Sequence, residues 1–323
     1  MKGVGRAGDT LFLHGGQYLK HLYGNVKRLS VIKPFDPWKS DLCTCRLKYS
    51  LHPYTGCSHF CLYCYATSYI GRKPSSPKKD FLNRLRRDLN YINRELVVEI
   101  SSSSDPYPPL EEWVMLTRQT LRVLADSKIK VLITTKSNIV VRDYDLLLRT
   151  PSSIMITITT LNEELARKLE PGAPPPHKRL EAIEYLSSKG LPVGVRIDPI
   201  IPGLNDNPLE IEKLIDEISV RGAKHIVTST YKVRFDNYKR MIKAFPKKKM
   251  LWKKLYFERG ERLHGYIYLP RSIREKLLEP IIKYGLKKGL SVATCREGLG
   301  ARYFKAPSCD GQHLIVEHPI FNP

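Results

Sequence analysis

Acidic residues are scarce in this chain: 32 Asp and Glu stand against 54 Lys and Arg over 323 residues, a formal net charge of +22. Such an excess favours a polyanionic partner, with nucleic acid ahead of an anionic membrane surface. Apolar runs of the roughly 18 residues that a membrane span needs are absent. Phosphate-binding glycine motifs of the P-loop and dinucleotide-binding kinds are absent too. The sequence therefore argues against a membrane-spanning protein and against both of these nucleotide-binding classes.

The composition is that of a folded protein, with 42% hydrophobic and 27% charged residues, which excludes a wholly disordered chain. Residues 1–20 lack the basic region, apolar core and cleavage site, in that order, of a secretory signal. We therefore expect a cytoplasmic protein, in which thiols stay reduced, and no membrane partner.

Most of the excess charge lies in one segment. Residues 231–305 contain 21 Lys and Arg but 6 Asp and Glu, so they hold +15 of the total. Their lysines alternate with aromatic residues, which are Tyr238, Phe245, Trp252, Tyr256, Phe257, Tyr266 and Tyr268. Because basic and aromatic residues together suit phosphate contacts and base stacking, we expect this segment to bind nucleic acid. The alternative is a solvated basic face whose aromatics turn inward as core.

From residue 46 onward the chain alternates strand-like and helix-like segments. Apolar runs predict buried parallel strands at residues 47–51, 95–100, 128–135, 152–159, 191–197 and 223–230. Helix-like segments lie between them, so we predict an α/β fold, a partial (β/α)6 TIM-like barrel over residues 46–230. Residues 1–45 would form an N-terminal extension and residues 231–323 a basic C-terminal region. Active sites of such barrels lie at the carboxyl ends of the strands.

Three of the seven cysteines stand close together. Cys57, Cys61 and Cys64 form a Cys-x3-Cys-x2-Cys loop after the first predicted strand, a spacing that indicates metal binding rather than disulfides. Three thiolates bind three irons of a cubane cluster and leave the fourth iron open to a small molecule. Zinc is the alternative, because His59 or a distant cysteine would complete the four protein ligands that structural zinc requires.

This loop and its flanks carry a family resemblance. The phrases are "HPYTGCSHFCLYCYA", "SSSSDPYPPLEE", "TTKSNIVVRDYDLL", "LEPGAPPPHKRLEAI" and "DPIIPGLND", spread over roughly residues 49–230. The cysteine loop resembles that of the radical S-adenosylmethionine (SAM) superfamily. The flanking phrases resemble its spore photoproduct lyase-like branch, also called DNA repair photolyase-like.

The resemblance implies a [4Fe-4S] cluster on Cys57, Cys61 and Cys64, with SAM bound to the open iron through its amino and carboxylate groups. One electron from an external donor would cleave SAM into methionine and a 5′-deoxyadenosyl radical, which takes a hydrogen atom from the substrate. The protein would contribute binding, orientation and exclusion of side reactions.

Side chains at predicted strand ends would bind SAM. In similar proteins the segment after the second strand binds the SAM amino group, so Ser103, Ser104 and Asp105 are candidates; the alternative is a Ser/Asp-Pro turn. Lys136 follows the third strand, where its charge would neutralise the SAM carboxylate.

Five further residues are candidates for this site. Thr159 follows the fourth strand and would face ribose or methionine, and Arg196 ends the fifth, where a charge needs a partner. Glu170 and Arg179 would bind ribose or carboxylate, or else form a salt bridge with each other. Tyr63 would border the adenine or pack in the core.

Four cysteines remain, as two pairs near opposite ends of the chain. Cys43 and Cys45 precede the first strand, and Cys295 and Cys309 lie in the C-terminal region. If the ends meet, the four would form an auxiliary site, either a second iron–sulfur cluster, a zinc site or a disulfide. The alternatives are a hydrogen-atom donor, Cys295 or Cys309, and simple burial of small side chains.

These observations predict a radical SAM enzyme that acts on nucleic acid held by residues 231–305. It would modify a base of tRNA or rRNA, or repair a DNA photolesion. Two alternatives remain: a radical SAM enzyme on a peptide or small molecule, and an iron–sulfur nucleic-acid-binding protein without catalysis.

Overall fold

A nine-stranded sheet forms the centre of the molecule in the computed structural model, which describes residues 20–35 and 42–315. The strand order is β1-β2-β5-β6-β7-β8-β9-β12-β13; the strands from β2 to β12 are parallel, and the two edge strands are antiparallel to their neighbours. Their bounds are β1 (Ile32–Pro34), β2 (Lys48–Leu51), β5 (Val97–Ile100), β6 (Val131–Thr135), β7 (Ser152–Thr157), β8 (Val193–Ile200), β9 (His225–Thr230), β12 (Ser291–Thr294) and β13 (Phe304–Lys305).

The predicted α/β class and partial barrel are confirmed, because all six expected parallel strands are present in the expected order. A seventh parallel strand, β12, pairs with β9 through the register Ser291↔His225. The boundary that we predicted at residue 230 therefore falls inside the sheet. The strand β12 has only four residues and lies among lysines and arginines, so the search for apolar runs did not identify it.

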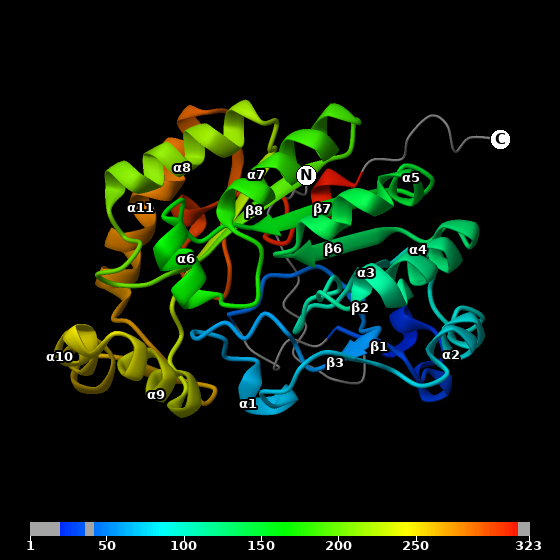
Figure 1. Cartoon of the computed structure of the whole chain (residues 1–323), viewed down its shortest axis with the longest axis horizontal. Coiled ribbons are helices and arrows are strands. Elements are labelled where there is room, and N and C mark those ends of the chain that lie inside the picture. Colours follow the sequence, from blue (N-terminus) through cyan, green and yellow to red (C-terminus); the bar gives the residue numbers. More distant parts are fainter. Residues whose placement is uncertain (1–19, 36–41, 316–323) are drawn as a thin grey trace, which may run out of the picture.

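Helices cover the outer face of this sheet (Figure 1). They are α2 (Phe81–Asp88), α4 (Leu116–Asp126), α5 (Tyr144–Leu147), α6 (Glu163–Leu169), α7 (Pro176–Ser188), α8 (Pro208–Val220) and α11 (Arg271–Lys287). Leu121 and Leu124 of α4 are three residues apart, so they share one face of the helix, and both are fully buried. They join outward strand residues such as Val98 and Ile133 in the largest core, so the outer layer is held by ordinary apolar burial.

Residues 231–270 form a separate group of short elements, drawn in yellow beside α1 (Thr67–Ile70) in Figure 1. The elements are α9 (Phe235–Ala244), η4 (Pro246–Lys248), α10 (Lys249–Trp252), the π-helix η5 (Lys253–Glu258), β10 (Glu261–Leu263) and β11 (Tyr266–Tyr268). Four of the aromatic residues that interleave with lysines are buried here: Trp252, Tyr256, Tyr266 and Tyr268. These four therefore follow the alternative interpretation and are core residues, while Phe257 is 39% exposed.

The inner face of the sheet carries a floor of apolar side chains. Because successive strand residues point to opposite faces, one residue from each strand reaches the interior at a given height. These residues are Val97, Leu132, Met155, Val227 and Ala293, and Cys309 packs among them. The next inward residues along each strand are mostly polar, so the interior divides into an apolar floor and a polar upper layer.

The C-terminal segment, residues 306–315, completes this floor. The Ser153 hydroxyl donates to the Gly311 carbonyl at 3.0 Å, and Lys48 Nζ lies 2.6 Å from Asp310 Oδ2. Gly311 has a φ of +85°, and a Cβ there would lie 2.5 Å from the sulfur of Met155. Glycine is therefore required both for the backbone conformation and for the close approach.

No helix among the described residues is long and apolar enough to span a membrane.

The buried cation Lys48 predicts a strong effect on stability. Its Nζ also lies 2.7 Å from Glu99 Oε2. Burial alone would lower the pKa of Lys48, but Asp310 and Glu99 together raise it well above the usual value. We expect Lys48→Ala to lower the free energy of unfolding by about 3–5 kcal/mol, because two buried carboxylates lose their cation. Urea unfolding measures this.

The matched control is Lys178→Ala, which removes an exposed pair with Glu181. An exposed pair contributes about 1 kcal/mol or less. Equal losses of stability in the two variants would contradict the assignment of Lys48 as the cation of the interior.

Candidate functional site

A cavity of about 370 Å³ lies above the apolar floor, at the carboxyl ends of the parallel strands. Its wall repeats the two-residue period of the strands, since each strand contributes alternate residues. These are Lys48, Ser50 and His52; Glu99 and Ser101; Thr134 and Lys136; Thr157; Arg196 and Asp198; Ser229 and Tyr231; and Cys295. All seven cysteines of the chain also line this cavity, so thiols and ionic groups meet in one enclosed space.

The loop after β2 brings Cys57, Cys61 and Cys64 to the mouth of the cavity. Backbone hydrogen bonds hold it from both sides: the Cys57 N–H donates to Lys73 O at 3.0 Å and the Leu62 N–H to Leu169 O at 2.8 Å. No disulfide engages these thiols. Three free thiols on one anchored loop, facing a cavity large enough for a small molecule, fit a [4Fe-4S] cluster with an open iron.

A buried contact between a histidine and an aspartate positions this loop against the sheet. His59 donates through Nδ1 to the Gly172 carbonyl at 2.9 Å, and its Nε2 lies 3.0 Å from Asp105 Oδ2. The same carboxylate accepts from the Lys136 N–H at 2.8 Å and the Thr135 hydroxyl at 2.7 Å. Both oxygens of Asp105 are therefore engaged by the protein, which makes this residue a link between the cysteine loop and the end of β6.

The serines before Asp105 surround a neutral histidine. His52 lies 3.4 Å from the hydroxyls of both Ser102 and Ser104, and burial lowers its pKa to about 4. Ser101 has a φ of +63°, which is costly for a residue with a Cβ. Its buried Oγ has no hydrogen-bond partner among the described residues. Since Ser103 also lines the cavity, the segment offers several hydroxyls to a bound molecule.

Lys136 and Tyr63 face each other across the cavity, with the ammonium 5.8 Å from the ring centroid. Burial alone would lower the pKa of Lys136, but nearby Cys61 and Glu170 raise it. No carboxylate lies within 4.0 Å of this ammonium in the part of the chain that the structure describes. A charged, half-buried lysine without such a partner suits the carboxylate of a ligand.

Three other predicted SAM residues turn away from the cavity. Glu170 and Arg179 form a fully buried ion pair at 2.5 Å, the second of the two possibilities that the sequence left open. The Tyr63 hydroxyl donates to Glu170, and Thr159 donates to the same carboxylate oxygen at 3.2 Å. None of Thr159, Glu170 and Arg179 lines the cavity, so together they hold Tyr63 in position behind it.

Arg196 reaches the cavity from β8, where Asp198 supplies the partner that its charge needs. The two side chains lie 2.5 Å apart, and the Ser229 hydroxyl donates to the other oxygen of Asp198 at 2.5 Å. Burial alone would raise the pKa of Asp198, but Arg196 lowers it. The pair is therefore ionised, and both of its side chains line the cavity.

Several cavity residues were missed by the sequence argument. Asp198 stands two residues beyond Arg196 on β8, so extending the two-residue period of that strand would have found it. Ser229 lies on β9, where no site residue was predicted. Lys232, which also lines the cavity, forms a buried pair at 2.7 Å with Glu297 from the loop after β12. That loop could not be assigned because β12 itself was not recognised.

The four remaining cysteines are brought together. Cys45 Sγ lies 3.6 Å from Cys309 Sγ, although the two residues are 264 positions apart. Cys295 and Cys43 line the same cavity. The segments around residues 43–45 and 295–309 therefore meet, as the auxiliary-site prediction requires.

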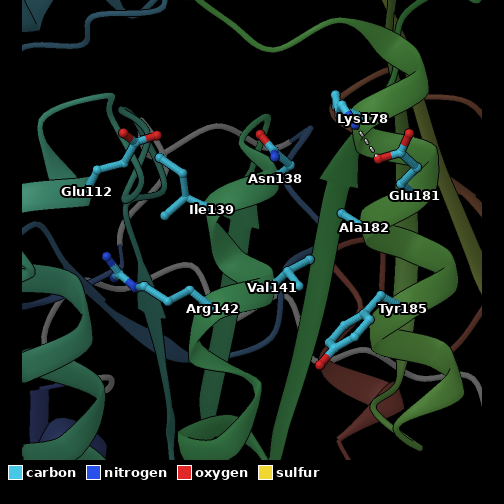
Figure 2. A pocket seen from close by; sticks show the side chains of 9 residues that line it. All are labelled: Glu112, Asn138, Ile139, Val141, Arg142, Lys178, Glu181, Ala182 and Tyr185. Carbon is cyan, nitrogen blue, oxygen red and sulfur yellow. Dashed lines mark hydrogen bonds and ion pairs between the residues drawn. The ribbon is translucent and has the colours of Figure 1, made fainter.

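A second hollow lies on the outer surface, between η3 (Asn138–Asp143) and α7. Figure 2 shows Lys178 and Glu181 paired with each other at its rim, opposite Glu112 and Arg142. It contains no thiol and none of the residues predicted from the sequence, so the inner cavity is the candidate active site.

The comparison with protein families agrees with this site. The model of the radical SAM superfamily matches residues 51–218, just over half of the chain. The chain therefore belongs to the radical SAM superfamily and is a radical SAM enzyme. Membership implies a [4Fe-4S] cluster and SAM as cofactors.

Within the superfamily, the fold is like that of spore photoproduct lyase. A mutant of that enzyme with bound AdoMet and dinucleoside spore photoproduct superposes with a TM-score of 0.61 at 16% identity, over 83% of this chain and 79% of the other.

Two relatives are similar in sequence. An uncharacterized protein of Mycobacterium tuberculosis is 28% identical over 253 residues, which is 72% of each chain. The radical SAM Nalpha-GlyT isomerase of Pseudomonas phage M6 is 22% identical over 287 residues, 81% of this chain and 59% of the isomerase.

The link through Asp105 predicts a pH-dependent contribution to stability. Burial alone would raise the pKa of this carboxyl, but His59 and the hydrogen bonds lower it from 3.8 to about 2. Ionised Asp105 thus stabilises the fold by about 2 kcal/mol above its unfolded pKa near 4. The contribution disappears as the pH falls toward 2.

We expect Asp105→Asn to lose this free energy at pH 7 and to lie closer to the wild type at pH 3. Urea unfolding followed by circular dichroism measures the difference. Asp126→Asn, which touches only an exposed pair with Arg149, is the matched control. A deficit in Asp105→Asn that is independent of pH would refute the role of the charge.

Proposed function

We propose that this radical SAM enzyme holds its [4Fe-4S] cluster on Cys57, Cys61 and Cys64 and acts on a nucleic acid. When bound, the cluster and SAM supply a 5′-deoxyadenosyl radical that removes a hydrogen atom from the substrate. The anchored loop with three free thiols at the cavity mouth supports this assignment most directly. An external electron donor completes the chemistry.

Different side chains of the cavity bind different parts of SAM. Lys136 neutralises the carboxylate of methionine, and Ser103 and Ser104, with the unpartnered hydroxyl of Ser101, accept from the amino group. Tyr63 borders the adenine, and Arg196 contacts the ribose or the substrate. Burial and the lining of the cavity support these roles. The remaining predicted residues, Asp105, Thr159, Glu170 and Arg179, act as positioning residues through His59 and Tyr63.

The substrate side of the proposal rests on α9, which is tied to the cysteine loop. Arg240 donates to the carbonyls of Leu62 and Cys64 at 3.1 and 2.9 Å, and Asn237 donates to Tyr63 O at 3.0 Å. A polyanion held by α9 would therefore lie next to the loop that carries the cluster.

The outer side of this region is rich in lysine. We define the lysine segment as residues 239–254; its exposed lysines are Lys239, Lys243, Lys247, Lys249, Lys253 and Lys254. Phe235, which is 70% exposed, lies 4.3 Å from the ammonium of Lys239 and offers a ring for stacking. Such a surface supports binding of nucleic acid through phosphate contacts.

The similar proteins support the same substrate class. The spore photoproduct lyase structure contains a dinucleoside, and the phage relative is described as a GlyT isomerase. We propose that residues 46–230 carry the cofactors, that residues 231–305 hold DNA, tRNA or rRNA, and that residues 1–45 are an N-terminal extension. Residues 1–19 and 36–41 of this extension lie outside the described residues.

The seven unlinked cysteines support a reducing, cytoplasmic location.

The cluster assignment predicts that Cys61→Ala loses both iron and SAM cleavage. After anaerobic reconstitution, we expect about four irons per wild-type chain on this loop and 5′-deoxyadenosine with dithionite and SAM. The variant should form less than about one hundredth of that product, because a cubane with one ligand lost is not retained. Chromatography of nucleosides gives the readout. Turnover by an iron-free variant would overturn the proposal, and a loaded wild type without 5′-deoxyadenosine would favour a binding protein.

The lysine segment predicts a salt-dependent loss of binding. Lys243→Ala/Lys247→Ala should weaken binding to its preferred nucleic acid on the order of tenfold and reduce the salt slope by about 1 per phosphate contact removed. Fluorescence anisotropy with tRNA, single-stranded DNA and duplex DNA ranks these substrates.

Lys213→Ala/Lys224→Ala removes the same charge from exposed positions on and after the outer helix α8 and is the matched control. Weak binding to all three probes, insensitive to salt, would instead favour a peptide or small-molecule substrate.

A further inference from the structure

Four thiols outside the cluster loop lie together beside the cavity. The sulfur of Cys45 lies 3.6 Å from that of Cys309. Cys43 and Cys295 line the same cavity. We call these four residues the thiol quartet. They are unlinked by disulfides, and three of them, Cys45, Cys295 and Cys309, pack in the apolar floor of the sheet.

The quartet lies between the first and the last parallel strands of the open sheet. Cys43 and Cys45 precede β2, while Cys295 directly follows β12 and Cys309 belongs to the C-terminal segment that completes the floor. Apart from the antiparallel edges, β2 and β12 are the first and last strands of the parallel sheet. The quartet thus joins the two sides of the sheet that no strand pairing connects.

Two basic side chains share the cavity with the quartet. Lys48 and Arg196 both line it, together with the four cysteines. Because cysteine binds metals as the thiolate, nearby positive charge suits a set of four sulfur ligands.

We propose that Cys43, Cys45, Cys295 and Cys309 bind a single metal ion through four sulfurs, with zinc as the metal that this donor set favours. Four cysteine ligands select tetrahedral zinc or an iron–sulfur cluster. Two sulfurs at the Zn–S distance of about 2.3 Å stand about 3.8 Å apart across a tetrahedral ion. The 3.6 Å between Cys45 and Cys309 matches this separation, whereas sulfurs on separate irons of a cubane lie farther apart.

The thiols move slightly when the ion binds. Among the described residues, neither the quartet nor the cluster loop is closed into a complete metal-binding arrangement. Both sets of thiols line one cavity and lie on loops rather than inside strands, so small shifts of these loops complete the coordination. When the ion binds, the protons of the four thiols are released to solvent.

The ion has two consequences for this enzyme. It links residues 264 positions apart, and closing so long a loop through a metal stabilises the fold by restricting the unfolded chain. The second consequence rests on the proposed function. Free thiols in the cavity would donate hydrogen atoms to a radical formed there, and metal-bound thiolates carry no such hydrogen. The quartet therefore protects the radical, and neither Cys295 nor Cys309 is a hydrogen-atom donor.

Metal analysis of a cluster-free variant tests the site without any assay of turnover. Cys57→Ala/Cys61→Ala/Cys64→Ala removes the ligands of the first cluster, so that metal retained after gel filtration belongs to the quartet. We expect about one zinc per chain and no acid-labile sulfide, by mass spectrometry of the elements and a sulfide assay. The wild-type holoenzyme should likewise contain about one zinc beside its iron, which covers the case in which the triple variant does not fold.

Single substitutions locate the ion. Adding Cys45→Ser or Cys309→Ser to the triple variant should lower retained zinc at least tenfold and lower the melting temperature. Thr44→Ser, an exposed position between Cys43 and Cys45, is the matched control and should keep the metal.

Three results would overturn the site: four thiols that react freely in a metal-free protein, a mass two units lower that reports a disulfide, or about four irons with sulfide in the triple variant. None of these depends on whether the substrate is a nucleic acid, so failure of this site and failure of the proposed function are distinguishable.

Discussion

The interior of this molecule depends on the buried ammonium of Lys48. It lies between Glu99 on the neighbouring strand and Asp310 in the C-terminal segment, with distances of 2.7 and 2.6 Å. A cation buried this deeply is tolerated only with such partners. The ion pair thereby fixes residues 306–315 under the sheet, where they complete the apolar floor. Without that floor, the polar layer above it would have no base and the cavity would be open at both ends.

The cysteine loop is positioned by two further buried polar contacts. His59 connects it to Asp105, whose carboxylate also binds the end of β6. Tyr63 connects it to the Glu170–Arg179 pair behind the cavity. Each contact satisfies charged or polar groups that would be costly to bury alone. The loop therefore presents three thiols from a rigid base, and α9 adds a third support through Arg240 and the loop carbonyls. The same helix bears the exposed Lys239 and Lys243, so the cysteine loop and the lysine segment share one support.

Periodicity explains which parts of the fold were predictable. The six strands from β2 to β9 were recognised by their short runs of apolar residues, and Leu121 and Leu124 recur at helical spacing. By contrast, β12 has four residues among basic neighbours, and its pairing with β9 depends on 60 intervening residues that fold elsewhere. From composition alone, aromatic residues such as Trp252 and Tyr266 could either stack on bases or belong to the core. Their burial in the structure shows that they are core residues. From the sequence, Glu170 and Arg179 could bind ribose or carboxylate or form a salt bridge with each other. Only the 2.5 Å contact between them in the structure identified the salt bridge.

The sequence by itself determined the superfamily of this protein, because the cysteine loop and its flanking phrases are local patterns. It also determined the class of fold, through the alternation of apolar strands with helices, and the surplus of positive charge. Only the tertiary structure decided which distant side chains meet. Cys45 and Cys309, Lys48 and Asp310, and Asp198 and Ser229 are brought together by strand order and by the path of the C-terminal segment. Contacts of this kind depend on the three-dimensional course of the backbone, which no local pattern encodes.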